Sequence, residues 1–390
     1  MIDRADAQQL DAADPLAGWR DEFVIPDPEL IYLDGNSLGR TPKRTVAALH
    51  RVVDQWSGDL INSWWEHDWL NLALTVGDEL APLLGARTGE VAVHESTTVG
   101  IFQLVNAALD LAPGGRVIAI DDADFPTDRY VVEGVARTRA CAVRHGLDDL
   151  EGVDVVLRSL VDYRTAEVAD LAGETARAAA VGATTVWDLS HAAGVLELDL
   201  PGAGVELAVG CTYKFLNGGP GAPAFVYVAE GVQDRLTQPI WGWFAQRDQF
   251  AMERAFDPRP GVGRMLNGTP PVLGLTAARE GIAVSVEAGI GAIAAKARAL
   301  TGFGIELADQ LGLPTSTPRE PVRRGGHVAV HHRDARALHA RLTERKVIVD
   351  YRDPDVLRFG LSPLTTSFAD VFDAFAVLAE LVVDAEPRHT

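Results

Sequence analysis

The stretch "LAVGCTYKFLNGGPGAPAFVYV", residues 207–228, joins two apolar runs through one lysine and a Gly-rich turn. The 390-residue chain contains 35 Lys plus Arg, of which only four are lysine: Lys43, Lys214, Lys296 and Lys346. Arginine keeps its proton, whereas a desolvated lysine can become a neutral amine nucleophile. Lys214 therefore indicates amine chemistry, although on residue type alone a lysine that reaches from a strand end to water explains the position better.

Apolar runs that resemble strands alternate with helical segments on both sides of this lysine. We predict strands at 90–96, 116–122, 153–162, 184–190, 207–214 and 223–230. Helical spacing is found at 97–112, 125–136 and 164–182. Such alternation predicts βαβ units, that is, an α/β fold with a mostly parallel sheet flanked by helices. In these folds the ligand lies at the carboxyl ends of the strands.

The length of the chain exceeds what one hydrophobic core usually serves. We expect an N-terminal segment (1–45) that packs on the small domain, a large α/β domain (46–265) and a smaller α+β C-terminal domain (266–390). Within the last of these, one long Ala-rich helix is predicted from Val272 to about Phe303.

Composition narrows the possible partners and compartments. A formal net charge of −20 argues against nucleic acid or an anionic membrane as the main partner. No apolar run approaches 18 residues, and the acidic start "MIDRADAQQLDAADP" lacks a signal-peptide pattern, so a cytoplasmic protein is expected. Two cysteines, Cys141 and Cys211, cannot form a disulfide framework or a four-ligand zinc site, and we expect no metal.

Polar residues follow several of the predicted strands. Ser96 opens a helix that continues with Thr97 and Thr98, an arrangement typical of an ordinary N-cap but also suited to a phosphate. Phe125 and Asp128 flank a Pro-Thr turn that includes Thr127. By itself each of these features is common.

Two more features lie further along the chain. Asp188 follows an apolar strand and precedes His191, and a buried carboxylate of this kind must be paired to stay charged. Tyr213 and Lys214 end the next strand. Together the features supply what pyridoxal 5'-phosphate needs: an amine, an acid for the ring nitrogen, an aromatic face and a phosphate site. Glycines after Lys214 would let the backbone pass close to such a cofactor.

With these motifs in view, the chain resembles kynureninase, within the class V branch of fold-type-I pyridoxal-phosphate enzymes. The similarity spans nearly the whole chain. It is carried by "DPLAGWRDEFVIP", "IYLDGNSLGRTP", "FPTD", "WDLSHAAG", "CTYKFLNGGPG", "GWF" and "LRFGLSPL".

The resemblance implies a role for each matching position. Lys214 corresponds to the Schiff-base lysine and Asp188 to the partner of the pyridine nitrogen. Tyr213 is implied as a proton donor or relay. Further cofactor contacts are implied for Thr97, Thr98, Phe125, Thr127, Asp128, His191, Tyr213, Trp243 and Thr269. Substrate contacts are implied for Ser37, Trp64, Thr269 and Arg358, of which Arg358 matches the clamp for the substrate carboxylate. Trp243 and Thr269 match positions that reach in from a neighbouring subunit, which implies a homodimer.

The implied reaction is hydrolysis of L-kynurenine to anthranilate and L-alanine. Trp64 and Ser37 offer little to pair a ring hydroxyl, and a buried unpaired hydroxyl costs roughly 1–3 kcal/mol, so a preference over 3-hydroxykynurenine is expected. One departure concerns the family's usual Gly-Trp-Phe-Gly-His, which reads "GWFAQ" here with Ala245 and Gln246. Because that histidine is absent here, an enzyme that acts on a different aryl-ketone amino acid stays an alternative.

Several alternatives compete with this interpretation. A class V aminotransferase shares the core motif, and a cysteine desulfurase or other β-lyase is a second candidate, the desulfurase needing a mobile nucleophilic cysteine. A non-catalytic binding module is the candidate from another class. "GIGAIA" (289–294) matches a dinucleotide fingerprint but lies inside a helical stretch, where close helix packing explains it better. His327 and His331 share a strand face that is more typical of a half-buried strand than of a metal site.

Overall fold

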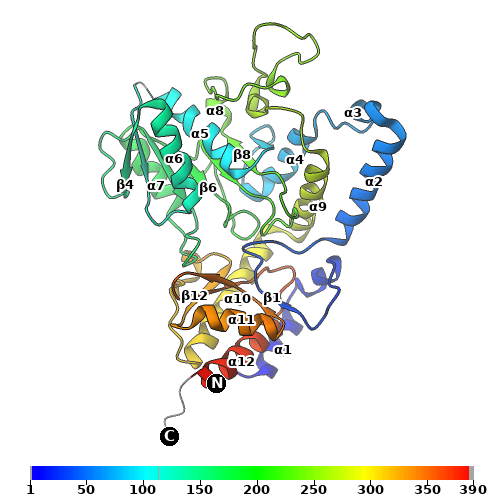
Figure 1. Cartoon of the computed structure of the whole chain (residues 1–390), viewed down its shortest axis with the longest axis vertical. Helices are drawn as coiled ribbons and strands as arrows, with labels where there is room; N and C mark the ends of the chain where they lie inside the picture. Colours follow the sequence, from blue (N-terminus) through cyan, green and yellow to red (C-terminus); the bar gives the residue numbers. More distant parts are fainter. Residues whose placement is uncertain (1, 113, 386–390) are drawn as a thin grey trace.

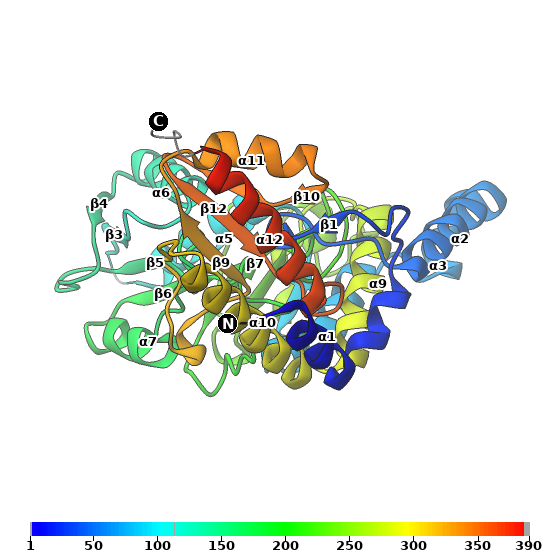
Figure 2. The same ribbon diagram turned by 90° about the horizontal axis from the view of Figure 1, so that it is seen from below.

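The structure is a computed structural model that describes residues 2–112 and 114–385. A seven-stranded sheet with its helices forms the upper part of the molecule in Figure 1, and the elements that follow residue 289 together with α1 form the lower part. Figure 2 shows the lower part from below, where α1 (Arg4–Ala13) packs beside α12 (Phe368–Ala385).

The large sheet has the strand order β2-β8-β7-β6-β5-β3-β4. Its strands are β2 (Val91–Val93), β3 (Val117–Ile120), β4 (Ala142–His145), β5 (Val155–Ser159), β6 (Thr184–Asp188), β7 (Leu207–Gly210) and β8 (Phe225–Val228). Only β8 runs antiparallel to its neighbours in this sheet, and the other pairings are parallel. The central strands are almost wholly buried, as expected for a sheet covered on both faces. The predicted α/β class is confirmed.

Helices connect and cover the strands of this sheet. The elements of this part are α2 (Lys43–Asp59), α3 (Ser63–Glu66), α4 (Leu72–Leu80), α5 (Thr97–Leu111), α6 (Pro126–Arg139), α7 (Leu171–Ala180) and α8 (Glu230–Gln233). In both Figure 1 and Figure 2, α2 and α3 project from one side of the molecule. Among the described residues, none of the helices has the length and apolar character needed to span a membrane.

The C-terminal part contains a small antiparallel sheet, order β11-β12-β9, and a separate parallel pair. Its elements are α10 (Ile290–Gln310), β9 (His327–His331), α11 (Ala335–Glu344), β10 (Val347–Ile348), β11 (Asp350–Arg352), β12 (Val356–Gly360) and α12. The preceding helix, α9 (Val272–Ala288), packs against α2 and α4 of the large part. Strand β1 (Ile31–Tyr32) pairs with β10, and Ala7 and Leu33 lie in the same hydrophobic core as α10 and α12. The domain boundaries at residues 45 and 265 stay a prediction.

Three details differ from the expectations. The single helix predicted from Val272 to Phe303 is wrong, because Gly289 adopts φ 83° and separates α9 from α10. A Cβ at Gly289 would meet nothing within 4 Å, so this glycine serves the break and not close packing. Helix α7 begins only at Leu171, where Asp170 caps it, and residues 164–170 are not helical. Strand β4 was not predicted.

Candidate active site

The carboxyl ends of the large sheet and the C-terminal part enclose a cavity of about 230 Å³. It is lined by Asn36, Ser37, Thr97, Thr98, Phe125, Thr127, Asp128, Ser159, Tyr163, Asp188, Ser190, His191, Tyr213, Lys214, Arg352 and Arg358. Most of the residues predicted to form the site are therefore brought together in one chain. Trp64, Trp243 and Thr269 are not among the lining residues.

Lys214 differs from Lys296 and Lys346 in the kind of group that it pairs with. Its Nζ lies 2.9 Å from Nε2 of His191, whereas Lys296 pairs with Asp14 at 2.6 Å and Lys346 with Asp27 at 3.0 Å. Burial, followed by the charge of Lys214, lowers the pKa of His191 well below its ordinary value. A neutral imidazole therefore faces the amine and can accept a hydrogen bond from it.

Asp188 and Asp128 form a buried pair beside Lys214. Asp188 Oδ1 accepts hydrogen bonds from the backbone N–H of Ser190 at 2.9 Å and from its hydroxyl at 2.6 Å. Burial, followed by the charge of Asp188, raises the pKa of Asp128 well above its ordinary value. Burial also raises the pKa of Asp188, but the hydrogen bonds from Ser190 and the charge of Lys214 oppose that rise. The pair therefore favours the proton on Asp128 and the negative charge on Asp188.

The start of α5 forms another wall of the cavity. Ser96 is the N-cap, and its hydroxyl accepts from the N–H of Val99 at 3.4 Å. The first turn of an α-helix has N–H groups without helical partners and carries partial positive charge. Thr97 and Thr98 add hydroxyls in the same turn, which suits an anion such as phosphate.

The turn that follows Lys214 owes its composition to backbone conformation. Asn217, Gly219 and Gly221 adopt φ of 56°, 90° and 70°, a region in which glycine is not strained. A Cβ at Gly219 or Gly221 would meet nothing within 4 Å of this chain. These glycines therefore have a conformational reason of their own, and the expectation that they allow a close approach to a cofactor stays a prediction.

A close approach does occur at Gly39, in the N-terminal "DGNSLG" motif. Its N–H donates to the carbonyl oxygen of Tyr213 at 2.8 Å. A Cβ at Gly39 would meet the carbonyl oxygen of Lys214 and would lie 2.8 Å from Cα of Asn217. The N-terminal turn is therefore fitted directly against the loop that carries Lys214.

Arg358 lies at the C-terminal wall of the cavity. Its side chain is 1% exposed, and its Nε donates to Oδ2 of Asp350 at 2.6 Å. Asp350 also lies 3.0 Å from Nε of Arg352, so one carboxylate serves two guanidinium groups.

Five lining residues were missed by sequence reasoning: Asn36, Ser159, Tyr163, Ser190 and Arg352. Asn36 and Ser190 stood inside motifs that had been singled out, so they could have been found. Asn36 is fully buried, and both polar atoms of its amide lack partners. Tyr163 follows β5 and Arg352 ends β11, and neither belongs to a motif that the sequence analysis identified.

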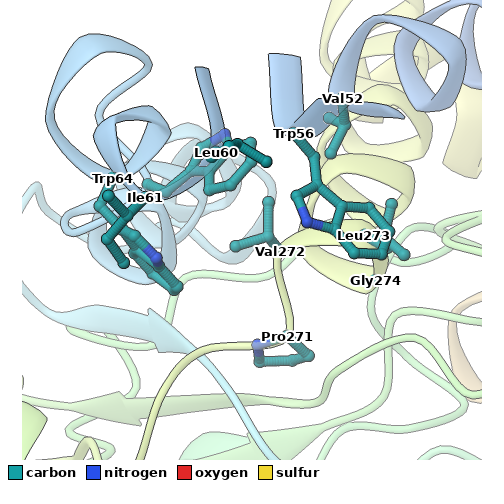
Figure 3. Close-up of a pocket in the computed structure, with 10 residues that line it drawn as sticks. Val52, Trp56, Leu60, Ile61, Trp64, Pro271, Val272, Leu273 and Gly274 are labelled. Carbon is teal, nitrogen blue, oxygen red and sulfur yellow. The ribbon is translucent and has the colours of Figure 1, made fainter. Parts of the chain in front are cut away.

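Trp64 lines a separate apolar groove. This groove is formed by Val52, Trp56, Leu60, Ile61, Trp64, Trp69, Pro271, Val272, Leu273 and Gly274. Figure 3 shows the indole rings of Trp56 and Trp64 on opposite sides, above Pro271. Trp56 and Trp65 are exposed whereas Trp69 is buried, so the tryptophans divide between surface and core.

Trp243 and Gln246 belong to a different hollow, which they share with Trp241 and Met252. Trp243 is 41% exposed, and Thr269 is exposed as well. Gln246 uses its side-chain oxygen to accept from the N–H of Asp257 at 2.8 Å, so here it holds the loop together.

Among the residues described, Asp59, Glu66 and His67 form one group of potential metal ligands, at the junction of α2 and α3. His67 Nε2 lies 2.8 Å from Oδ2 of Asp59, a contact that an ordinary hydrogen bond explains. His327, by contrast, is fully buried and its ring centroid lies 5.9 Å from that of His191. Four of the five residues of β9 are buried, so this strand is more deeply buried than expected.

The fold is that of fold-type-I, class V pyridoxal-phosphate enzymes. The apo cysteine desulfurase of Thermococcus onnurineus NA1 superimposes with a TM-score of 0.79 at 18% identity, over 91% of this chain and 95% of that one. A cysteine desulfurase of Escherichia coli gives a TM-score of 0.78 at 15% identity, over 95% and 98%. At these identities the likeness concerns the fold alone.

Sequence comparison identifies the particular family. The chain is 44% identical to kynureninase of Deinococcus radiodurans, over 99% of this chain and 98% of that protein. It is 40% identical to kynureninase of Pseudomonas fluorescens, over 98% and 96%. The model of the kynureninase C-terminal domain matches residues 293–378. The chain belongs to the kynureninase family.

Proposed function

We propose that this protein binds pyridoxal 5'-phosphate and hydrolyses the Cβ–Cγ bond of L-kynurenine, releasing anthranilate and L-alanine. The observation that carries this proposal is one cavity that presents both a lysine amine, Lys214, and a buried arginine, Arg358. The kynureninase relatives support the substrate, since they match over almost the whole chain.

The residues of the cavity fit the cofactor. Asp128 Oδ2 and His191 Nδ1 are buried polar atoms without partners, as expected where a polar group is to be received. Thr97 and Thr98 at the start of α5 would hold the phosphate, and Phe125 would cover a face of the ring. Asp188 would keep the ring nitrogen protonated, with Thr127 nearby. When bound, the cofactor supplies an electron sink for charge that develops at the amino acid's α-carbon.

Side chains of the cavity bind the substrate and transfer the protons. Arg358 binds the α-carboxylate of the substrate. Lys214 takes the proton from the α-carbon, and His191 holds the amine in position. Burial raises the pKa of Tyr213, so its phenol stays protonated and can deliver a proton to the β-carbon. Water adds to the γ-carbonyl, the Cβ–Cγ bond breaks, and the aryl part leaves as anthranilate.

Incubation with L-kynurenine tests the proposal. We expect equal amounts of anthranilate, seen by its fluorescence, and L-alanine, and no product from Lys214→Ala. Lys43→Ala, at an exposed lysine, is the matched control and should retain activity. Borohydride treatment should attach the cofactor to Lys214 alone. Formation of a keto acid instead of anthranilate would point to an aminotransferase, and a colourless, inert protein would contradict the enzyme.

We further propose a homodimer in which Trp243, Thr269 and Trp64 complete the cavity of the partner. Their position outside the cavity of their own chain supports this arrangement. Mixing and refolding Lys214→Ala with Trp243→Ala should restore activity, because one site of the mixed dimer then contains both intact residues. No recovery, or a monomer by light scattering, would contradict it. A cytoplasmic location also stays a proposal, to be tested by cell fractionation.

Within this function we propose a preference for L-kynurenine over 3-hydroxykynurenine. Ser37 gives the cavity a small hydroxyl, and an unpaired buried ring hydroxyl would weaken binding. The unpaired amide of Asn36 is the group that could reverse the preference. Comparing kcat/KM for the two substrates decides between these outcomes.

A further inference from the structure

Arg358 is held from two sides by groups of its own chain. It lies on β12 directly opposite Asp350 of β11 in the strand register. Its Nε donates to Asp350 Oδ2 at 2.6 Å, and its Nη2 donates to the same oxygen. Its Nη1 donates to the backbone carbonyl of Tyr163. A fully buried guanidinium thus has three of its N–H bonds committed to the protein.

A guanidinium carries five N–H bonds in one plane. With one each committed on Nε, Nη1 and Nη2, two remain, one on each terminal nitrogen. Because Nε and Nη2 face Asp350 along one edge, the N–H groups at the end of the side chain, one on each terminal nitrogen, are the pair that would bind both oxygens of a carboxylate. Asp350 contacts the side edge of the Arg358 guanidinium. Among the described residues, Arg358 lines the cavity and Asp350 does not.

We propose that Asp350 is a positioning residue that orients Arg358 so that its end-on N–H pair faces the substrate's α-carboxylate. This inference rests on the proposed function, because it assumes an α-amino acid in the cavity. Asp350 also separates two like charges, since Arg352 lies 3.0 Å from the same carboxylate oxygen and lines the same cavity. Without that carboxylate the two guanidinium groups would repel each other and Arg358 would turn away.

Asp350→Asn in the cofactor-loaded enzyme tests the role. The product L-alanine serves as a probe, and ethylamine, which lacks only the carboxyl group, serves as its counterpart. Spectral titrations measure both dissociation constants. We expect the Kd of L-alanine to rise about tenfold or more, because a misoriented Arg358 loses its charged hydrogen bonds to the carboxylate. The Kd of ethylamine should stay unchanged. For L-kynurenine, KM should rise far more than kcat falls.

Controls separate positioning from general stability. Asp309→Asn removes an exposed carboxylate that binds Arg319 with contacts of 2.5 and 2.7 Å, and it should change neither Kd. Adding Asp350→Asn to Arg358→Gln should raise the L-alanine Kd no further, because Asp350 acts through Arg358. Additive effects, or a wild-type Kd in Asp350→Asn, would overturn the proposal. A lower Kd would mean that Asp350 competes with substrate and would overturn it too.

If Asp350→Asn does not fold, the same titrations are made with Asp350→Glu. It keeps the charge but displaces the carboxylate by one methylene, so the L-alanine Kd should rise while the ethylamine Kd stays the same. An unchanged L-alanine Kd would refute the geometric claim. If wild type releases no anthranilate from L-kynurenine, the proposed substrate fails, yet the L-alanine titration still reports on Asp350.

Discussion

The Nζ atom of Lys214 lies 2.9 Å from Nε2 of His191, an imidazole whose pKa burial keeps well below the ordinary range. The lysine is thus held by a neutral partner and not by a carboxylate, unlike Lys296 and Lys346. A neutral partner restrains the position of the amine without locking it in an ion pair.

His191→Ala should release this restraint. We expect kcat for anthranilate formation to fall by about 100-fold, the order found when a reacting group is misplaced by 1 Å. Steady-state kinetics with L-kynurenine measure the loss. His50→Ala, at an exposed histidine, should behave as wild type. Wild-type kcat in His191→Ala would show that the hydrogen bond has no part in the reaction.

Ser190→Ala should shift the acid limb of the pH–activity profile. The Ser190 hydroxyl donates to Asp188 at 2.6 Å and thereby lowers the pKa of that carboxyl. Without it the pKa of Asp188 rises, so the ionised form that the proposed reaction uses is lost at a higher pH. We expect the acid limb of kcat/KM to move up by about one pH unit. Ser57→Ala, which removes an exposed hydroxyl from α2, should leave the limb in place.

Gly39→Ala should damage the Lys214 loop from outside the cavity. The new methyl group would collide with the carbonyl oxygen of Lys214 and with Cα of Asn217. Overpacking of this kind costs about 1–3 kcal/mol of stability and should also reduce kcat. Thermal unfolding and kinetics measure both effects. At Gly18 a Cβ meets nothing within 4 Å, so Gly18→Ala is the control, and equal behaviour of the two variants would contradict the contact.

His94 should make folding stability depend on pH. Burial lowers its pKa from 6.5 to about 4, and both ring nitrogens lack partners. Between these values the unfolded chain binds a proton that the folded chain does not, so stability is lost as pH falls from 6.5 toward 4. Between pH 7.5 and 5.0 this effect alone lowers the free energy of unfolding by about 2 kcal/mol.

The variant His94→Gln should lack that part of the pH dependence, whereas His50→Gln should keep it. Urea unfolding at both pH values provides the comparison. An identical pH dependence in wild type and His94→Gln would assign the titration to other groups.

Sequence patterns predicted the central strands of the large sheet, which carry the site, better than they predicted its edge strand. Strands β6 and β7 are continuous apolar runs, because they are buried on both faces. Strand β4, by contrast, is the partly exposed edge strand "AVRH", whose composition does not differ from that of a loop. The break at Gly289 was hidden for a similar reason, since Ala-rich sequence on both sides favours helix and a single glycine is tolerated within one.

Within the site, residues carried by motifs were predictable and residues placed by tertiary pairing were not. Asp188 ends β6, and Thr97 and Lys214 follow β2 and β7 of the same mostly parallel sheet, so the three lie at one edge of it. The pairing of Asp350 with Arg358 depends on the register of two short strands, which no local pattern encodes.

The parallel pairing of Ile31–Tyr32 with Val347–Ile348 has a consequence for biosynthesis. The turn that supports the Lys214 loop through Gly39 follows a strand made early in translation, but its partner strand leaves the ribosome more than 300 residues later. The lysine loop can therefore acquire its final support only after nearly the whole polypeptide has been synthesised. A nascent chain that stops short of residue 347 would contain every motif around Lys214 and still be inactive.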